Sequence, residues 1–549
     1  MNCVWLVMLL GAVTPTVGAA VSNAISEVMV YRSPSSQAVP PSSAKITTAL
    51  ADVYQRRNGA MLWSNERAPT AQALALITAL RAADDAGLRA ANYRGEELAQ
   101  RLTVLGAELA ATSTQWAEFD VALSSAALLF ISDLHFGRVD PHAAGFDIPM
   151  AETVFDRAAF LEQLAARADT AAVLTELEPR YVHYRLLRQA LVRYRKLASE
   201  LTLPALPPLP GAAPKVGEFY AGMSTLRQWL VALGVLPVEV GASTDLVMDD
   251  AMAAALKRFQ YLHGLEADGK LGKRTFAALT VPMAQRVRQI ELTLERWRWL
   301  PPLGAGTIIV NIPQFRLFAL KAAEDFEADM LRMDVIVGKE YPHTHTPVFA
   351  ADLKYVVFRP YWNVPYSILS RELLPELRAH PSRWASKHLE IVRGGGDEAT
   401  PLAPTAENLA LLAAGQLRVR QRPGADNALG LVAFMLPNTY NVYLHSTPAP
   451  RLFQQARRAF SHGCIRVSDP VALAEQVLRD TPGAWTREKI NAAIDSKTTT
   501  KVVLRKPLQV LILYGTAVAT EDGAVHFLED LYGYDRQLEA LLGLKPVVP

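Results

Sequence analysis

Five prolines within residues 204–214 divide the chain into parts that no single helix or strand can join. Proline fixes its own φ angle and donates no backbone hydrogen bond, so regular structure does not run through such a segment. The 549 residues also exceed the roughly 100–200 residues of one domain. We therefore expect about three domains, with a stiff linker over residues 204–215. The prolines are Pro204, Pro207, Pro208, Pro210 and Pro214.

The part before this linker reads as helical. From residue 45 to residue 203, Ala and Leu recur at helical spacing, as in residues 71–83 and 117–129. After the linker, residues 216–282 contain three short helical runs and predict a small three-helix module. Its aromatic side chains Phe259 and Tyr261 are expected in the core. The three runs are residues 223–233, 249–262 and 273–279.

The last half of the chain changes to runs typical of β-strands. A connecting helix over residues 283–305 precedes them, and a mostly helical insertion over residues 366–430 interrupts them. Insertions on a sheet scaffold often act as lids, so we expect this one to cap the site. The fold class is therefore multidomain α+β, with a mainly-β domain last. The strand-like runs are residues 306–313, 331–337, 355–358, 432–435, 442–444 and 510–514.

The composition excludes several classes of protein. Lys and Arg number 56 and Asp and Glu 54, so the net charge of +2 predicts no nucleic-acid partner and no polybasic membrane surface. Half of the residues are hydrophobic and 20% are charged, which argues against disorder of the whole chain.

The N-terminus predicts export. Residues 3–13 are apolar and small residues follow to Ala20, so residues 1–20 read as a signal peptide cleaved near Ala19. About 20 apolar residues are needed to span a membrane, and this run is shorter. No Lys or Arg precedes it, so retention as an inner-membrane anchor stays open. Residues 21–44, rich in Ser, Pro and Ala, predict a disordered tether.

Removal of the signal would leave Cys464 as the one thiol of the mature chain. A thiol is a weak nucleophile unless a nearby group stabilises its anion, and a histidine can do so. His445 ends a strand-like run 19 residues earlier, so a loop can return Cys464 beside it. We expect Cys464 to attack, His445 to move protons, and the amides of Gly463 and Cys464 to hold an oxyanion.

Other nearby residues allow more than one interpretation. Two residues of strand separate His462 from Cys464 by roughly 7 Å, which favours a supporting role for this histidine. Arg466 has a guanidinium suited to a substrate carboxylate, although a plain surface arginine is the alternative. A zinc site is a further alternative, but no standard ligand spacing is present, and we expect no metal and no cofactor. Its candidate ligands would be His343, His345, His445, His462 and Cys464.

His445, followed after fifteen residues by the run from Ser461 to Cys464, resembles the signature of the L,D-transpeptidase (YkuD) catalytic domain. The motifs at residues 360–365, 420–424 and 531–535 resemble the large YcbB-like subfamily. Residues 63–64, 84–88 and 134–138 are similar to the scaffold domain of that subfamily, and residues 257–260 and 268–272 to a peptidoglycan-binding domain.

The resemblance implies a periplasmic enzyme that acts on tetrapeptide stems of peptidoglycan. In the family the cysteine attacks the third-position diamino acid, expels D-alanine and passes the acyl group to a neighbouring stem, which gives a 3→3 cross-link. Carbapenems acylate the same cysteine, and other wall-synthesis proteins are expected partners. The implied catalytic residues are Cys464, His445, Ser446, Gly463 and His462. The implied substrate-binding residues are Tyr443, Ser461, Arg466, Trp362 and Asn363.

Two positions depart from the family pattern. Close relatives usually have Asp where this chain has Ser446, and often Lys where Ala433 stands. If the backbone carbonyl of residue 446 orients His445, serine leaves activity intact, because a carbonyl can fix the tautomer as a carboxylate does.

Three other functions stay open. The same site would serve an L,D-carboxypeptidase if water were the acceptor, or an enzyme that anchors proteins to the wall if a protein lysine were. A wall-binding scaffold with an inactive catalytic half is the third. The predicted catalytic domain covers residues 306–505, and residues 506–549 are expected to pack on it as a C-terminal segment.

Overall fold

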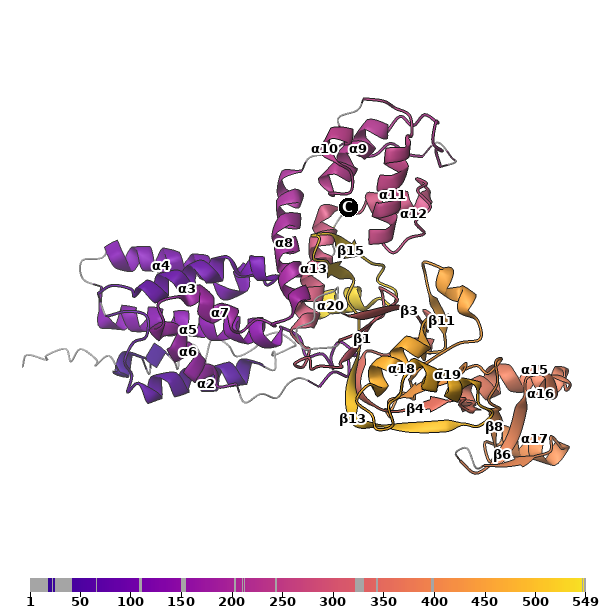
Figure 1. Cartoon of the computed structure of the whole chain (residues 1–549). Helices are drawn as coiled ribbons and strands as arrows, with labels where there is room; N and C mark the ends of the chain where they lie inside the picture. The colour runs from indigo at the N-terminus through magenta and orange to yellow at the C-terminus, as the bar shows by residue number, and fades with distance from the viewer. Residues whose placement is uncertain are drawn as a thin grey trace, which may run out of the picture.

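The computed structural model describes most of the chain outside its N-terminus. The predicted signal peptide and tether fall largely outside the described residues and stay predictions. Figure 1 shows the N-terminal helices at one side, the small helical module above, and the sheet with its insertion below. The described residues are 18–21, 23–24, 42–65, 67–107, 111–149, 155–201, 204–209, 211, 213–241, 244–320, 330–341, 344–395, 399–545 and 547.

The N-terminal region is a helical bundle, as predicted, around the helix α5 (Ser113–Phe136). A capping box between Thr112 and Gln115 begins α5. Asp120 of α5 accepts hydrogen bonds from the backbone of Leu62 (2.9 Å) and Trp63 (2.7 Å), so it fixes the segment after α2. The other helices of the bundle are α2 (Ser42–Arg56), α3 (Ala71–Arg81), α4 (Gly95–Ala107), α6 (Arg157–Ala166) and α7 (Thr170–Thr175).

Within the described part of the chain, α5 is the one helix long and apolar enough to cross a membrane. Of its most apolar window, 78% is buried among other parts of the protein. That burial is typical of a core helix.

The small module contains α9 (Met223–Ala232), α10 (Val238–Gly241), α11 (Asp250–Leu262) and α12 (Lys273–Leu279). Gln260 fixes its turn, because its side chain accepts from Gly269 N (2.8 Å) and donates to Asp268 (2.8 Å). Phe259 lies in the core as predicted. The prediction for Tyr261 is wrong: its side chain is 55% exposed and contacts the ring of His526 at 5.3 Å.

Two helices from distant parts of the sequence form the junction between the domains. The helix α8 (Val182–Glu200) packs against α13 (Met283–Trp297) and the C-terminal hairpin of β14 (Ala517–Ala519) and β15 (Val525–Phe527). Glu295 of α13 is fully buried, accepts from Val139 N (3.1 Å), and pairs with Arg138 and Arg298. The motif at residues 134–138 therefore links the helical bundle to α13.

The last half forms a nine-stranded sheet in the order β11-β3-β12-β10-β9-β4-β13-β1-β2. A further pairing of β2 with β3 closes it on itself. Apolar side chains such as Val310, Phe434 and Ile465 form one core together with side chains of α18 (Pro470–Leu478) and α19 (Arg487–Asp495). The strands are β1 (Ile308–Asn311), β2 (Arg316–Ala319), β3 (Leu331–Gly338), β4 (Phe349–Phe358), β9 (Val432–Met435), β10 (Leu444–His445), β11 (Ala459–Ser461), β12 (Ile465–Val467) and β13 (Thr500–Leu513).

The insertion contains the predicted helices and also a sheet that the sequence analysis missed. Four strands pair in the order β5-β8-β6-β7, and Leu377, Ile391 and Val419 belong to a core of their own. Its elements are β5 (Trp362–Asn363), α14 (Tyr366–Ile368), η4 (Leu369–Leu373), α15 (Leu374–Ala379), α16 (Arg383–Ser386), β6 (Leu389–Arg393), β7 (Thr400–Leu402), α17 (Ala406–Ala413) and β8 (Arg418–Gln421).

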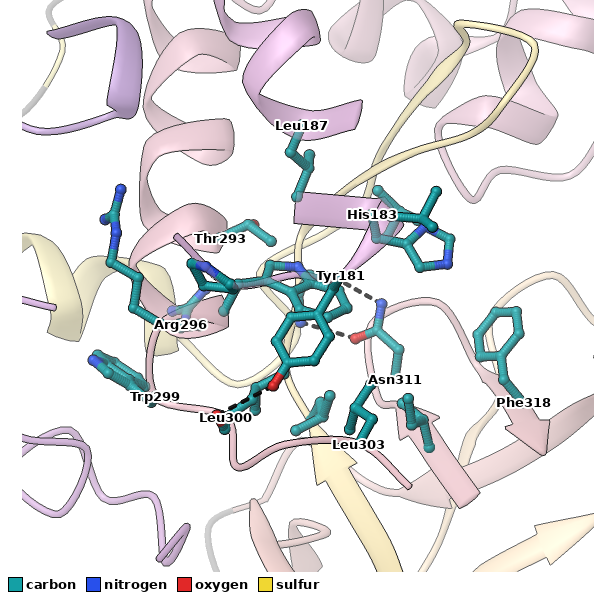
Figure 2. Close-up of a pocket in the computed structure, with 18 of the residues that line it drawn as sticks. Tyr181, His183, Leu187, Thr293, Arg296, Trp299, Leu300, Leu303, Asn311 and Phe318 are labelled. Carbon is teal, nitrogen blue, oxygen red and sulfur yellow. Dashed lines mark hydrogen bonds between the residues drawn. The ribbon is translucent and has the colours of Figure 1, made fainter. Parts of the chain in front are cut away.

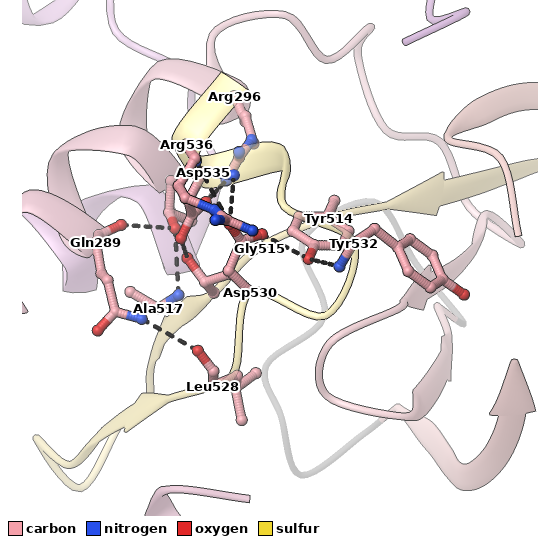
Figure 3. A network of polar contacts seen from close by, with 12 residues as sticks. Gln289, Arg296, Tyr514, Gly515, Ala517, Leu528, Asp530, Tyr532, Asp535 and Arg536 are labelled. Carbon is pink, nitrogen blue, oxygen red and sulfur yellow. Dashed lines mark hydrogen bonds and ion pairs between the residues drawn. The ribbon is translucent and has the colours of Figure 1, made fainter. Parts of the chain in front are cut away.

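The strand β13 runs through residues 505 and 506, where the sequence analysis placed the end of the catalytic domain, and it pairs with both β4 and β1. Beyond β13, α20 (Tyr534–Leu541) is tied back to α13 by a buried network (Figure 3). In it Asp535 pairs with Arg296 at 2.5 Å and accepts from Thr516 Oγ1 at 2.7 Å.

We expect Asp535→Ala to lower the free energy of unfolding by about 3 kcal/mol, because it leaves the Arg296 guanidinium buried without its counter-ion. Asp522 is the matched control, since its pair with Arg258 (3.0 Å) is exposed and its removal should cost less than about 1 kcal/mol. Urea unfolding followed by tryptophan fluorescence measures both. Equal losses in the two variants would contradict an anchoring role for Asp535.

Candidate active site

The pairing of β10 with β12 places four side chains on one face of the sheet. The strands are parallel, with Leu444 opposite Ile465 and His445 opposite Arg466. Leu444 and Ile465 point into the interior and are fully buried. Because side chains alternate along a strand, Tyr443, His445, Cys464 and Arg466 share the opposite face. The structure thus brings together the predicted nucleophile, the predicted base and two predicted substrate-binding residues.

The turn before Cys464 requires glycine. Gly463 has φ +117°, a backbone conformation that other residues rarely adopt. Ser461 Oγ closes the turn, because it accepts from Gly463 N (3.1 Å) and donates to Cys464 O (2.6 Å). The Gly463 amide is therefore already engaged in a hydrogen bond, which leaves the Cys464 amide as the better oxyanion donor. Ser461, predicted to bind substrate, supports this turn.

The Cys464 thiol donates a hydrogen bond to the backbone carbonyl of Asn441 at 3.7 Å. Asn441 adopts a left-handed conformation with φ +54°, and Asn438 holds the loop by donating to Val442 O (2.7 Å). Burial raises the pKa of the thiol, while hydrogen bonding by Tyr443 and the charge of Arg466 oppose the shift. The raised pKa favours a protonated thiol at Cys464, whereas the sequence analysis expected a thiolate stabilised by a nearby histidine.

His445 is buried and neutral. Burial, and then the charge of Arg466, lower the pKa of His445 to about 4. Its Nδ1 donates to the backbone carbonyl of Ser446 at 2.6 Å, so in the neutral ring Nε2 is unprotonated and can accept a proton.

The Ser446 side chain has a different task. Its Oγ accepts hydrogen bonds from Leu431 N (2.7 Å) and Val432 N (3.1 Å) and so fixes the segment that leads into β9. A Cβ on Gly430 would lie 2.1 Å from this Oγ, which explains the glycine there. The contact to His445 comes from the backbone of Ser446, so a serine at this position preserves it.

Arg466 has a half-buried guanidinium whose Nε has no hydrogen-bond partner among the described residues. Burial lowers its pKa, and the neighbouring Cys464 partly offsets this shift. A side chain with donors to spare beside a nucleophile is suited to an anionic group of a ligand.

The insertion contacts the catalytic loop through a pair that sequence reasoning missed. His462 is exposed and donates from Nε2 to Glu372 of the insertion at 2.8 Å. Glu372 is about 90 residues away in sequence, so no local pattern could have found it. Trp362 and Asn363 lie on β5, where they pair with Gln421 and Arg420 of β8. The structure does not join these two residues to Cys464 by a hydrogen bond.

The histidines of the alternative zinc site do not gather. His345 stacks on Tyr532 at 4.0 Å, and its Nε2 bonds to Glu340 O at 2.6 Å, while His343 lies outside the described residues. Tyr532 also donates to Gly338 O at 2.7 Å, so the C-terminal segment supports the loop beside the cysteine. Where side chains are described, no three His, Cys, Asp or Glu residues are placed to hold a metal ion.

We expect iodoacetamide to alkylate Cys464 slowly at pH 7 and faster, by about tenfold per pH unit, as the pH rises toward the raised pKa of the thiol. Peptide mass spectrometry measures the rate at Cys464, with N-acetylcysteine as the reference thiol. His445→Gln should keep the shape of this profile, because the resting histidine carries no charge. An alkylation rate that is fast and constant from pH 5 to pH 8 would instead indicate a thiolate–imidazolium pair.

Comparison with known protein families agrees with this arrangement. The L,D-transpeptidase catalytic domain (YkuD) matches residues 305–503, a "Scaffold domain" matches residues 48–191, and a "Putative peptidoglycan binding domain" matches residues 220–279. The three matches follow the order of the helical bundle, the small module and the sheet.

Individual proteins are also similar to this chain. A "Putative L,D-transpeptidase" of Haemophilus influenzae is 32% identical over 284 residues, which cover 51% of this chain and 55% of that protein. The match thus spans about half the length of the curated relative. A crystal structure of the L,D-transpeptidase (residues 123–326) from Xylanimonas cellulosilytica is 16% identical, with 56% of this chain and 100% of that chain covered and a TM-score of 0.17. A TM-score this low supports no structural argument, so the family assignment rests on the domain matches and the curated relative.

The chain carries an L,D-transpeptidase catalytic domain of the YkuD family, preceded by a scaffold domain and a peptidoglycan-binding domain.

Proposed function

We propose that the protein is an exported cysteine L,D-transpeptidase that forms 3→3 cross-links in peptidoglycan. The observation that carries the proposal is the shared face of β10 and β12, which carries both a thiol and a neutral histidine with an unprotonated Nε2. The substrate would be a tetrapeptide stem, and the acceptor the side-chain amine of a neighbouring stem. Periplasmic location, other wall-synthesis partners and acylation by carbapenems belong to the same proposal.

The first half-reaction forms a thioester. The thiol leaves the Asn441 carbonyl and transfers its proton to His445 Nε2 as sulfur attacks the carbonyl of the third stem residue. The Cys464 amide donates to the oxyanion. The tetrahedral intermediate collapses, the bond to D-alanine breaks, and His445 returns the proton to the departing amine.

The second half-reaction forms the cross-link. An acceptor amine attacks the thioester, His445 takes a proton from it, and the sulfur leaves and regains a proton. The neutral resting histidine suits both steps, because it must first accept a proton each time.

Arg466 would bind the carboxylate of the terminal D-alanine through its unpaired guanidinium. Tyr443 would border the stem beside Cys464, and Gly463 and Ser461 would hold the catalytic turn. Ser446 would orient His445, and His462 would hold the insertion. Trp362 and Asn363 of β5 would contact the substrate from the side of the insertion.

We expect Cys464→Ala to abolish the reaction of the mature chain with a disaccharide tetrapeptide. Intact-protein mass spectrometry should detect an adduct equal to the donor minus D-alanine in the parent only, together with a 3→3 dimer identified by fragmentation. An adduct with tripeptide alone would favour a carboxypeptidase, and transfer to a protein lysine an anchoring enzyme. If folded parent protein forms no adduct, the proposal fails and a wall-binding scaffold is the better interpretation.

We expect Glu372→Gln to raise KM for the donor by up to about fivefold and to leave kcat nearly unchanged, because an exposed side-chain hydrogen bond contributes little. Glu407→Gln, on an exposed helix of the same insertion, is the matched control. If His462 acts through Glu372, His462→Gln should give the same change and the double variant no more. Additive effects of the two substitutions would contradict this coupling.

A further inference from the structure

A cavity of about 900 Å³ lies at the junction of the domains, away from the candidate active site. Its walls come from the start of α8, the end of α13, the loop that follows α13, and the outer face of β1 and β2 (Figure 2). Tyr443, His445, Cys464 and Arg466 are not among its lining residues. The proposed reaction therefore does not use this space.

Part of the cavity floor is apolar. Along β1 and β2, Ile308, Val310 and Leu317 point into the closed sheet, while the alternate residues point outward and line the cavity; of these Ile309 and Phe318 are apolar, and Asn311 and Arg316 are polar. Leu303 of the loop lines the same space. Apolar surface at the bottom of a concave site favours burial of an apolar group.

One wall of the cavity is aromatic and held in place. The rings of Tyr181 and Trp297 lie 5.3 Å apart, and His183 stacks on Trp297 at 6.0 Å. The Tyr181 hydroxyl donates to the backbone carbonyl of Pro301 at 2.8 Å, so its hydrogen-bonding capacity is used within the protein. This wall therefore presents the surfaces of aromatic rings to a ligand rather than free hydrogen-bonding groups.

The mouth of the cavity is positively charged. Arg180 and Arg185 line it and are exposed, and neither forms an ion pair with another described residue. The acidic residues of the lining are neutralised, because Glu176 pairs with Arg167 at 2.6 Å and Glu178 pairs with Arg188. Two unpaired guanidinium groups at an apolar pocket complement an anion.

We infer that this cavity binds an amphipathic anion, with its apolar chain between the aromatic wall and the sheet and its phosphate or carboxylate at Arg180 and Arg185. The volume lies within the roughly 300–1,000 Å³ of small-molecule sites. Both a lipid phosphate and a free carboxylic acid have this chemistry, and the two sources can be told apart by experiment.

The test is isothermal titration calorimetry of the whole chain with three octyl probes below their micelle concentrations. They are octyl phosphate, octanoate and the uncharged octyl glucoside. We expect one or both anions to bind at a single site and the glucoside to bind at least about tenfold more weakly, because it lacks the charge-assisted contacts. Tighter binding of the phosphate would favour a lipid source, and tighter binding of the carboxylate a free acid.

Two kinds of variant assign the binding to this cavity. The double variant Arg180→Gln, Arg185→Gln should weaken anion binding about tenfold. The matched control, Arg505→Gln with Lys506→Gln, removes two exposed charges from β13 and should bind like the parent. Leu303→Trp should fill the cavity and remove binding of every probe, and Ile309→Trp provides a second filling variant. Near-ultraviolet circular dichroism checks that each variant is folded.

Cys464→Ala should bind the probes as the parent does, so this result is independent of the proposed reaction. The inference is overturned if no probe binds, if octyl glucoside binds as tightly as the anions, or if folded Leu303→Trp and Ile309→Trp bind like the parent.

Discussion

The parallel pairing of β10 with β12 is the constraint on which the candidate active site depends. Each strand is short, and the register of two residue pairs decides which side chains face outward. A slip by one residue would turn Cys464 into the apolar interior and bring Ile465 to the surface. The antiparallel partners β9 and β3 hold the register from both sides, and the closed sheet leaves little freedom for it to shift.

Buried polar side chains fix the position of particular segments within and between the domains. Asp120 ties the helical bundle to its first segment, Gln260 shapes the turn of the small module, and Glu295 joins the bundle to α13. Each is a side chain whose burial is tolerated because several donors or acceptors surround it. Specific polar contacts thus act together with apolar packing, both within the domains and where the bundle meets α13.

Much of the fold could be predicted from the sequence, because local patterns of apolar spacing and turn residues determine where many helices begin and end. The helices α11 and α12 begin and end within one residue of the ranges expected from spacing and turn residues. The chemistry of Cys464 and the strand before His445 predicted the two residues on which the candidate site is centred, and both lie on the shared face of β10 and β12. The strands β6 to β8 were missed because each is short and lies between helical runs, so their pairing depends on contacts distant in sequence. Asn441 and Glu372 were missed for the same reason, and Tyr261 because an exposed aromatic side chain on a helix looks like a core one.

The hydrogen bond between the Cys464 thiol and the Asn441 carbonyl has a consequence for the chemical lifetime of the protein. Oxidation by peroxides and exchange with disulfides both proceed through the thiolate. A half-buried sulfur that keeps its proton reacts slowly with either, and within the described residues there is no second cysteine to form a disulfide with it. The contact that holds the proton on Cys464 therefore also protects the thiol from both reactions.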